Sequence, residues 1–391
     1  MMVEKGIRQL KKFNEELCGD KVEVYHDDRR FLMALSDGLG SGVKANILAT
    51  LTSKIIITMV KEGMGLSDVI DTIGKTLPIC QVRNISYATF TIVEIDKINS
   101  IATLIEFDNP GALIFRDNRL IEIEGVKEEF KNHKVKKSIF KLQYGDILVL
   151  FSDGVIHAGI GAKLKLGWPR KEVARYIHKI IRRREGISME ELADWLAEAC
   201  NNFYDNKPGD DTTIAAIRVR PSQSVTILVG PPKDRSKDKE VTELLMKEEG
   251  KKIVCGGTTS KLVARELGKN IKVELDEKSK NMSKVGQIPP GGTIEGIDLV
   301  TEGVLTLQRV YSVLSGEEKL PKGNYGINKT LYTFVETLRE SDVITFLVGR
   351  AINPAYQNPD LPLATGVKEH LINKIASILQ RQGKRVNIKY F

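Results

Sequence analysis

The stretch SDGLGSG at residues 36–42 lies between an apolar run, Phe31–Ser36, and a segment of helical length, Val43–Glu62. The apolar run predicts a buried strand, and the glycines predict a tight turn from that strand into a helix. An aspartate at a strand end is held rigidly, and the glycine after it leaves space for a metal ion, its waters or a phosphate. Asp37 is therefore a candidate functional carboxylate.

Three further stretches place aspartates beside small residues at the ends of predicted strands: CGD at 18–20, FSDGV at 151–155 and GDDTT at 209–213. Their carboxylates would repel one another strongly if the fold brought them together without cations. Hard oxygen ligands with room for water suit Mg²⁺ or Mn²⁺. We therefore expect a divalent metal site that draws on five acids: Asp20, Asp37, Asp153, Asp210 and Asp211.

Two other phosphate-binding motifs do not fit the sequence. A dinucleotide loop that starts at Gly38 needs its third glycine at the position of Val43. A phosphate loop that ends at Gly74–Lys75–Thr76 needs its first glycine at the position of Val69.

Runs of strands with paired helices make up the chain before Pro221, which predicts an α+β domain of packed antiparallel sheets over residues 1–221. The predicted helices are Val43–Glu62, Asp68–Leu77, Arg170–Arg184 and Met189–Tyr204. The predicted strands are Phe31–Ser36, Tyr87–Asp96, Ser100–Asp108, Ala112–Arg116, Asp146–Ser152 and Thr212–Val219.

With the four acidic motifs in this order and spacing, residues from about 7 to 219 resemble the bacterial serine phosphatases of the stage II sporulation protein E type. These are a branch of the metal-dependent type 2C protein phosphatase family. The resemblance implies a β-sandwich flanked by helix pairs, in an α/β/β/α order of layers. It also implies hydrolysis of phosphoserine or phosphothreonine, with a phosphoprotein such as an anti-anti-sigma-like regulator as substrate.

The same resemblance implies a role for each acid, with two divalent cations, Mn²⁺ or Mg²⁺, as cofactors. Asp37 would bridge both ions and, with Asp153, be essential for catalysis, while the Gly38 carbonyl would bind one ion with support from Asp20. Asp153 and Asp210 would hold the other ion, and Asp211 could serve in place of Asp210.

The general acid is not assigned by the motifs. The wider family often has a histidine after the Asp-Gly pair, whereas this chain has Leu39. His26 and His157 lie near the motifs in sequence, although a lone histidine of this kind is more often a surface residue.

After a linker near Arg220–Ser224, strands alternate with helices, which predicts a Rossmann-like layered α/β domain with a mostly parallel sheet over residues 222–391. The predicted strands are Val225–Val229, Lys252–Cys255, Ile271–Leu275, Asp298–Val300, Val343–Val348 and Val386–Phe391. The predicted helices are Lys239–Glu249, Ser260–Leu267, Val304–Leu314, Lys329–Arg339 and Val367–Arg381.

Two glycine-bearing turns of this second domain each follow a strand and precede a helix: Gly256–Gly257–Thr258–Thr259 and Thr301–Glu302–Gly303. Free N–H groups at a helix start favour anions, and threonine hydroxyls add donors, so we expect an anionic small ligand there. The alternative is that the threonines only cap helices. Pro289–Pro290–Gly291–Gly292 predicts a loop near the same edge, and Cys255 lacks the paired histidine of a nucleophile.

Composition narrows the remaining classes. With 391 residues, 41% hydrophobic and 28% charged, the chain fits a globular protein of two or more domains. No uninterrupted apolar run reaches the roughly 18 residues of a membrane span, so we expect a cytoplasmic protein with no membrane partner. The net charge of +8 is spread among 51 acids, which makes nucleic acid an improbable partner. The four scattered cysteines form no CxxC pair, which argues against a cysteine zinc site.

Two functional classes stay open for the whole chain. The first is an enzyme whose phosphatase domain is controlled by a ligand-sensing or docking domain, with a homodimer as a candidate assembly. The second is a pseudophosphatase scaffold that binds without turnover. Retention of all four acidic motifs favours the enzyme.

Overall fold

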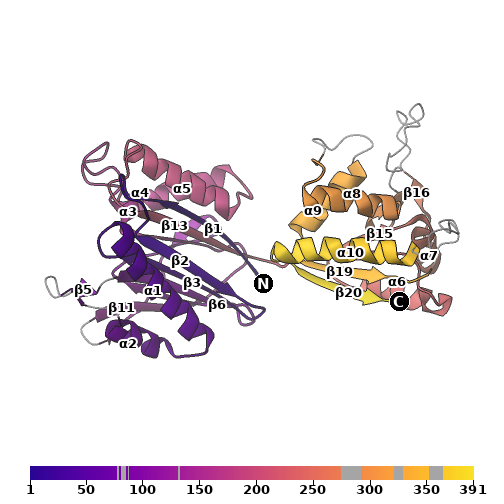
Figure 1. Cartoon of the computed structure of the whole chain (residues 1–391), viewed down its shortest axis with the longest axis horizontal. Helices are drawn as coiled ribbons and strands as arrows, with labels where there is room; N and C mark the ends of the chain where they lie inside the picture. The colour runs from indigo at the N-terminus through magenta and orange to yellow at the C-terminus, as the bar shows by residue number, and fades with distance from the viewer. Residues whose placement is uncertain are drawn as a thin grey trace. The chain divides into compact units, whose positions relative to one another are not determined.

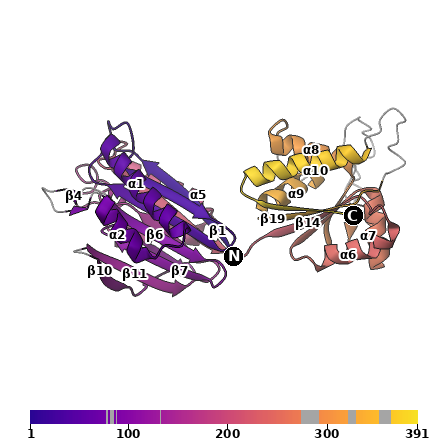
Figure 2. The ribbon, with the colours of Figure 1, turned by 60° about the horizontal axis from the view of Figure 1, so that its bottom comes forward.

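The structure is a computed structural model that describes residues 1–76, 79–80, 85–86, 88–130, 133–273, 292–320, 329–351 and 364–391. The chain divides into two compact units, Met1–Pro221 and Ser222–Phe391 (Figures 1 and 2). Each unit has hydrophobic cores of its own.

Two antiparallel sheets form the centre of the N-terminal unit. The first has the order β1-β13-β12-β8-β9, with strands Met2–Leu10, Thr212–Arg220, Ile147–Phe151, Leu113–Arg116 and Arg119–Ile121. The second has the order β10-β11-β7-β6-β3-β2, with strands Val126–Phe130, His133–Lys141, Ile101–Phe107, Ala88–Asp96, Arg30–Gly38 and Asp20–His26. A separate short pair joins β4 (Ile79–Cys80) to β5 (Ile85–Ser86).

Helices cover the outer faces of both sheets, so the unit has four layers (Figure 1). Helices α4 and α5 pack on the first sheet, and α1 and α2 pack on the second. The helices of this unit are α1 (Gly42–Lys61), α2 (Leu66–Thr76), the short α3 (Asp153–Ile156), α4 (Arg170–Arg183) and α5 (Met189–Phe203). The predicted α+β sandwich of packed antiparallel sheets is therefore confirmed.

The middle of strand β3, Phe31–Leu35, is apolar because both of its faces are covered. Phe31 and Met33 point between the sheets, whereas Leu32 and Ala34 lie under α1 and α2. Successive side chains of a strand point to opposite faces, so a strand buried on both sides needs an unbroken apolar run. This arrangement fixes the carboxyl end of β3, where Asp37 lies.

Helix α1 is, by length and composition alone, apolar enough to cross a membrane, with a mean hydropathy of 1.4 over its window. Two lysines, Lys44 and Lys54, interrupt its apolar sequence. In the structure, Ala45, Ala49 and Ile56 are fully buried, and Ile56 belongs to the core under the second sheet. This buried side packs on the second sheet, whereas Val43, Ile47 and Leu51 of the same helix are exposed.

Several edge elements were not predicted from sequence. Strand β1 pairs with β13 over its whole length, from Met2 opposite Arg220 to Leu10 opposite Thr212. At Gly6, helix α5 approaches so closely that a Cβ would lie 2.0 Å from the Met189 carbonyl oxygen. The edge strands β2 and β10 and the interior strand β11 were missed as well.

The C-terminal unit contains one seven-stranded sheet in the order β16-β17-β18-β15-β14-β19-β20. The five strands β18, β15, β14, β19 and β20 run parallel, while β16 and β17 pair antiparallel at one edge. The strands are β14 (Ser224–Val229), β15 (Lys251–Cys255), β16 (Lys272–Val273), β17 (Gly292–Ile294), β18 (Ile297–Thr301), β19 (Val343–Val348) and β20 (Arg385–Tyr390). The predicted mostly parallel sheet is confirmed.

Helices lie on both faces of this sheet. Helices α6 (Asp238–Lys247) and α7 (Gly257–Leu267) share one core with it, and α8 (Val304–Ser315), α9 (Lys329–Glu340) and α10 (Ala364–Arg381) share the other. The predicted strand Ile271–Leu275 is described only to residue 273, and residues 289–291 of the predicted proline-glycine loop lie outside the described residues. Gly292 begins β17.

Candidate metal centre

The four acidic motifs of the N-terminal unit converge at one end of its two sheets. Asp20 begins β2 and Asp37 lies near the end of β3, and these two residues are directly opposed in the antiparallel pair. Asp153 follows β12, and Asp210 precedes β13, the strand beside β12. The turns at these strand ends therefore bring together carboxylates that are up to 190 residues apart in sequence.

Asp20 is the most deeply held of these acids, with 1% of its surface exposed. Its Oδ2 accepts a hydrogen bond from Ser152 Oγ at 2.7 Å, and Ser152 Oγ in turn accepts one from the Thr213 backbone N–H at 2.9 Å. Its Oδ1 is buried with no hydrogen-bond partner among the described residues. A buried carboxylate oxygen without a partner is costly, and a cation would satisfy it.

Burial and neighbouring carboxylates raise the pKa of three of these acids. Burial raises the pKa of Asp20 to about 7, with Asp211 and Asp153 adding to the rise. Burial, followed by the charge of Asp20, raises the pKa of Asp37 to about 9. Burial and the charge of Asp153 raise the pKa of Asp210. Carboxylates that resist ionisation without counter-ions are suited to divalent cations, which stabilise their charged form and offset their mutual repulsion.

The glycines of both Ser-Asp-Gly turns are required by close backbone approaches. A Cβ at Gly38 would lie 2.1 Å from the carbonyl oxygen of Ala45 in α1, and a Cβ at Gly154 would lie 2.0 Å from the carbonyl oxygen of Asp211. A Cβ cannot be accommodated at either distance without moving backbone. These contacts fix Asp37 against α1 and Asp153 against the turn that precedes β13.

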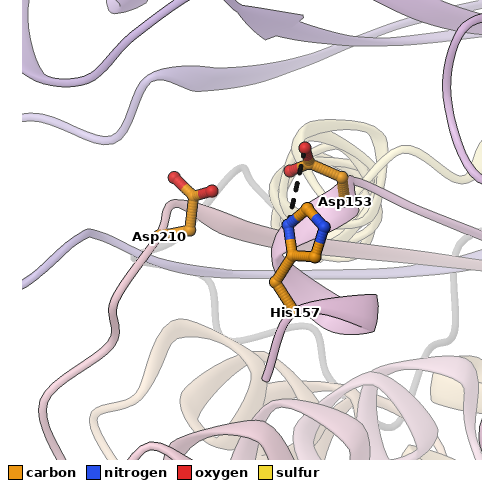
Figure 3. A group of neighbouring side chains, drawn as sticks. All are labelled: Asp153, His157 and Asp210. Atoms are coloured by element: carbon orange, nitrogen blue, oxygen red, sulfur yellow. Dashed lines mark ion pairs between the residues drawn. The ribbon is translucent and has the colours of Figure 1, made fainter. Parts of the chain in front are cut away.

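Asp153, Asp210 and His157 form a distinct group at this end of the unit (Figure 3). One ligand atom from each lies within 4.8 Å of the others, and His157 Nδ1 is 3.7 Å from Asp153 Oδ2. The side chains of His157 and Asp153 are 47% and 45% exposed, so this part of the centre is open to solvent. The group can hold a metal ion and leave positions for water or substrate.

The adjacent acids Asp210 and Asp211 have different surroundings. Asp210 joins Asp153 and His157, whereas Asp211 is 3% exposed and its Oδ1 accepts a hydrogen bond from the Lys12 backbone N–H at 3.0 Å. A Cβ at Gly19 would lie 2.7 Å from Asp211 Oδ2, so Asp211 faces the CGD turn that carries Asp20. This geometry favours Asp210 as the partner of Asp153.

The two histidines near the motifs also differ. His157 lies one helical turn after Asp153, and its backbone N–H donates to the Asp153 carbonyl at 2.9 Å. His26 ends β2 six residues beyond Asp20, which places it roughly 20 Å along the strand from that acid. His26 therefore does not belong to the centre, whereas His157 does. Proximity in sequence alone could not distinguish the two histidines.

In the C-terminal unit, the two glycine-bearing turns lie side by side. Cys255 and Thr301 are paired residues of parallel strands, and the Gly256 backbone N–H donates to the Thr301 carbonyl at 2.9 Å. Helix α7 begins at Gly257, three residues earlier than predicted, with Thr258 exposed and Thr259 buried. Gly257 has open space where a Cβ would stand.

Cys255 is buried beneath these turns and does not suit nucleophilic chemistry. Its surface is 1% exposed, and burial raises the pKa of its thiol to about 12. Thr301 Oγ1 donates to its sulfur at 3.1 Å. A neutral, buried thiol behaves as a small packing residue.

A helix-sheet-sheet-helix sandwich with this carboxylate cluster at one end has the fold of the metal-dependent type 2C phosphatases. Residues 27–220 of the N-terminal unit, just under half of the chain, match the family model of stage II sporulation protein E (SpoIIE). The family match does not extend into Ser222–Phe391.

Among known proteins, stage II sporulation protein E of Bacillus subtilis (strain 168) is 23% identical over 200 residues, which cover 49% of this chain and 22% of that protein. Stage II sporulation protein E of Priestia megaterium is 19% identical over 226 residues, which cover 56% of this chain and 37% of that protein. The chain thus spans less than half the length of either relative.

A solved structure of the PP2C phosphatase domain and a fragment of the regulatory domain of SpoIIE from Bacillus subtilis is 20% identical to this chain. The match covers 56% of this chain and 64% of that structure, with a TM-score of 0.46.

Proposed function

We propose that the N-terminal unit hydrolyses phosphoserine or phosphothreonine on a regulatory phosphoprotein, with two divalent cations, Mn²⁺ or Mg²⁺, as cofactors. The observation that carries this proposal is the convergence of buried and half-buried carboxylates with raised pKa values at one end of the sandwich. The match of residues 27–220 to the SpoIIE family model supports it.

Different acids of the centre would hold each of the two cations. Asp37 neighbours both Asp20 and Asp153, so it is placed to hold both cations, and the absence of a Cβ at Gly38 lets its backbone lie against α1. Asp153 and Asp210 would hold the second cation. When bound, such cations neutralise phosphate charge and lower the pKa of a water.

Ser152 orients the most buried acid. By donating to Asp20 Oδ2 and accepting from Thr213 N–H, it holds one oxygen of this carboxylate, while Oδ1 is buried with no hydrogen-bond partner among the described residues. Orientation of metal ligands by neighbouring hydrogen bonds commonly matters 10–100-fold for metal affinity. The match to the SpoIIE family model supports this substrate class, and we propose a phosphorylated anti-anti-sigma-like regulator as one candidate.

Hydrolysis of an aryl phosphate by the full chain tests the activity. We expect turnover with Mn²⁺ or Mg²⁺ and none after the metal is removed by a chelator. Metal binding without turnover of an aryl phosphate or of phosphoproteins would instead establish the pseudophosphatase scaffold. Efficient turnover of a free phosphorylated metabolite, with none of phosphoproteins, would overturn the proposed substrate class.

For the C-terminal unit we infer a Rossmann-like domain that binds an anionic small ligand and biases the phosphatase. The parallel strands lie in the spatial order β18-β15-β14-β19-β20. Numbered along the chain, this order is 3-2-1-4-5, which supports a Rossmann-like fold. Ligands of such sheets bind beyond the carboxyl ends of the strands, where the order reverses. Here the order reverses between β14 and β19.

A buried cation lies at that point and supports an anionic ligand. Lys368 of α10 is 8% exposed, and its Nζ donates to the carbonyl of Gly349, which directly follows β19. Nζ also lies 2.6 Å from where a Cβ of Gly230, directly after β14, would stand. Burial lowers the pKa of this lysine, so an anion bound nearby would favour its charged form.

A thermal-shift screen of the full chain tests this second proposal, with nucleotides, phosphorylated sugars and organic acids as probes. A tight ligand raises the melting temperature by mass action. The same screen is repeated with Gly257→Val, which the open space at Gly257 can accommodate without disturbing the fold. The unit is instead a docking or dimerisation domain if no probe raises the melting temperature. The same conclusion follows if neither Gly257→Val nor Lys368→Met changes the shift that a probe causes.

A further inference from the structure

The position of His157 is fixed by the buried residues around it. Val155 and Ala158 are buried at 1% and 0% exposure, and the Ile156 carbonyl accepts a hydrogen bond from the Trp168 backbone N–H at 2.7 Å. These contacts hold the short helical turn in place while the imidazole remains on its open side. The backbone of His157 is therefore held beside the carboxylates by these buried contacts.

The distances suit one ion held by three side chains. Bonds of about 2.0–2.2 Å from a metal to nitrogen or oxygen allow two of its ligand atoms to lie up to about 4.4 Å apart. The Nδ1 of His157 and Oδ2 of Asp153 are 3.7 Å apart, and every pair in the group with Asp210 lies within 4.8 Å. A closing movement of a few tenths of an ångström by partly exposed side chains brings the set into range.

We propose that His157 is a nitrogen ligand of the ion held by Asp153 and Asp210, and that it makes this position selective for Mn²⁺ and other transition metals over Mg²⁺. The proposal rests on the metal centre of the proposed function and adds to it the identity of a donor and a preference. Imidazole suits first-row transition metals, whereas Mg²⁺ prefers oxygen ligands and retains several waters. One imidazole nitrogen among carboxylates therefore raises the affinity of the position for Mn²⁺ and other transition metals relative to its affinity for Mg²⁺.

An exposed ion pair with Asp153 alone is a weaker account of the same residue. Such a pair needs only Asp153, which lies one turn away in the same segment. The approach to Asp210, which arrives from the turn before β13, is explained by a shared ion that draws on both segments.

Pulsed electron paramagnetic resonance of bound Mn²⁺ tests the proposal in the untagged full chain. We expect ¹⁴N modulation from a coordinated imidazole in the natural protein and its loss in His157→Gln, with Mn²⁺ still bound by the acids. His370→Gln is the matched control, because His370 is an exposed histidine of the other unit, and its signal should equal that of the natural protein. Loss of the modulation in Asp153→Asn would assign the signal to this ion.

Equilibrium affinities provide the second measurement. In His157→Gln we expect Co²⁺ affinity to fall roughly 10–100-fold, and Mg²⁺ affinity to change by less than about threefold, because Mg²⁺ takes water in place of imidazole. Bound Mn²⁺ without ¹⁴N modulation, or equal losses for Co²⁺ and Mg²⁺, would overturn the role of His157 and leave the phosphatase proposal standing. Failure of the natural protein to bind Mn²⁺ at all would overturn both.

Discussion

Asp20 and Asp37 are directly opposed across the β2–β3 hairpin, so their side chains share one face of the sheet at its end. Like charges at opposed positions of an antiparallel pair destabilise it. The two carboxylates at the end of this hairpin repel each other unless protons or cations neutralise them. The stability of the hairpin therefore depends on occupancy of the metal centre.

The substitution Asp37→Asn should reduce phosphatase activity at least about a hundredfold, because it removes a carboxylate that neighbours both cation positions. The metal-free protein should melt at an equal or higher temperature, since a repulsive buried acid is gone. Asp205→Asn, an exposed acid on the same unit, is the control and should change neither quantity. Normal turnover by well-folded Asp37→Asn would remove the basis of the assignment.

Without metal, the stability of the N-terminal unit should fall as pH rises from about 5 to 9. The folded-state pKa values of Asp20 and Asp37, about 7 and about 9, lie above the ordinary value of 3.8. The folded state thus binds more protons than the unfolded chain in this window, and the stabilisation that these protons give is lost as pH rises. Melting temperatures across this range measure the effect.

Saturating Mn²⁺ should raise the melting temperature more at pH 8.5 than at pH 5.5, because metal binding must displace protons at the lower pH. The metal-free slope should be shallower in Asp37→Asn. A metal-free melting temperature that rises steadily toward pH 9 would contradict the coupling between these acids.

Ser152→Ala should destabilise the protein by about 1–3 kcal/mol, because Asp20 Oδ2 and the Thr213 N–H both lose a buried hydrogen-bond partner. Metal affinity should fall as well, since Asp20 loses its orientation. Ser315→Ala, at an exposed helix end in the other unit, is the comparison. Urea denaturation and metal titration report the two effects separately.

Gly154→Ala should disrupt the centre, since its Cβ would lie 2.0 Å from the carbonyl oxygen of Asp211. The added atom pushes Asp153 away from the turn that carries Asp210, so metal affinity should fall together with stability. Gly65→Ala introduces a Cβ that meets nothing nearer than 3.4 Å and should be tolerated. Equal behaviour of the two variants in a metal titration would show that this close approach is unimportant.

Much of the fold could be predicted from the sequence because its decisive signals are local. The apolar run of β3 and the glycines after it predicted both a strand and a turn into α1. The strands β1 and β2 were missed because they lie at sheet edges and are only half-buried. The pairing of β1 with β13 joins the two ends of a 221-residue unit, and no local pattern records such a contact.

The acids of the site were predictable, but their partners were not. Asp210 and Asp211 are neighbours in sequence, and only the fold separates the one beside Asp153 from the one that accepts from Lys12. Likewise, four residues of helix bring His157 back to Asp153, whereas six residues of extended strand carry His26 away from Asp20. Sequence distance is similar in the two cases, and backbone geometry decides.

The pairing of β1 with β13 also has a consequence for synthesis of the chain. Asp20 leaves the ribosome 190 residues before Asp210, which at about 5–20 residues per second is roughly 10–40 seconds. Throughout that interval β1 lacks its partner strand, and Asp210 cannot join the acids made before it. A nascent chain that stops just before residue 212 therefore already contains the acids of the centre. It lacks β13, so the first sheet is incomplete and the site cannot form.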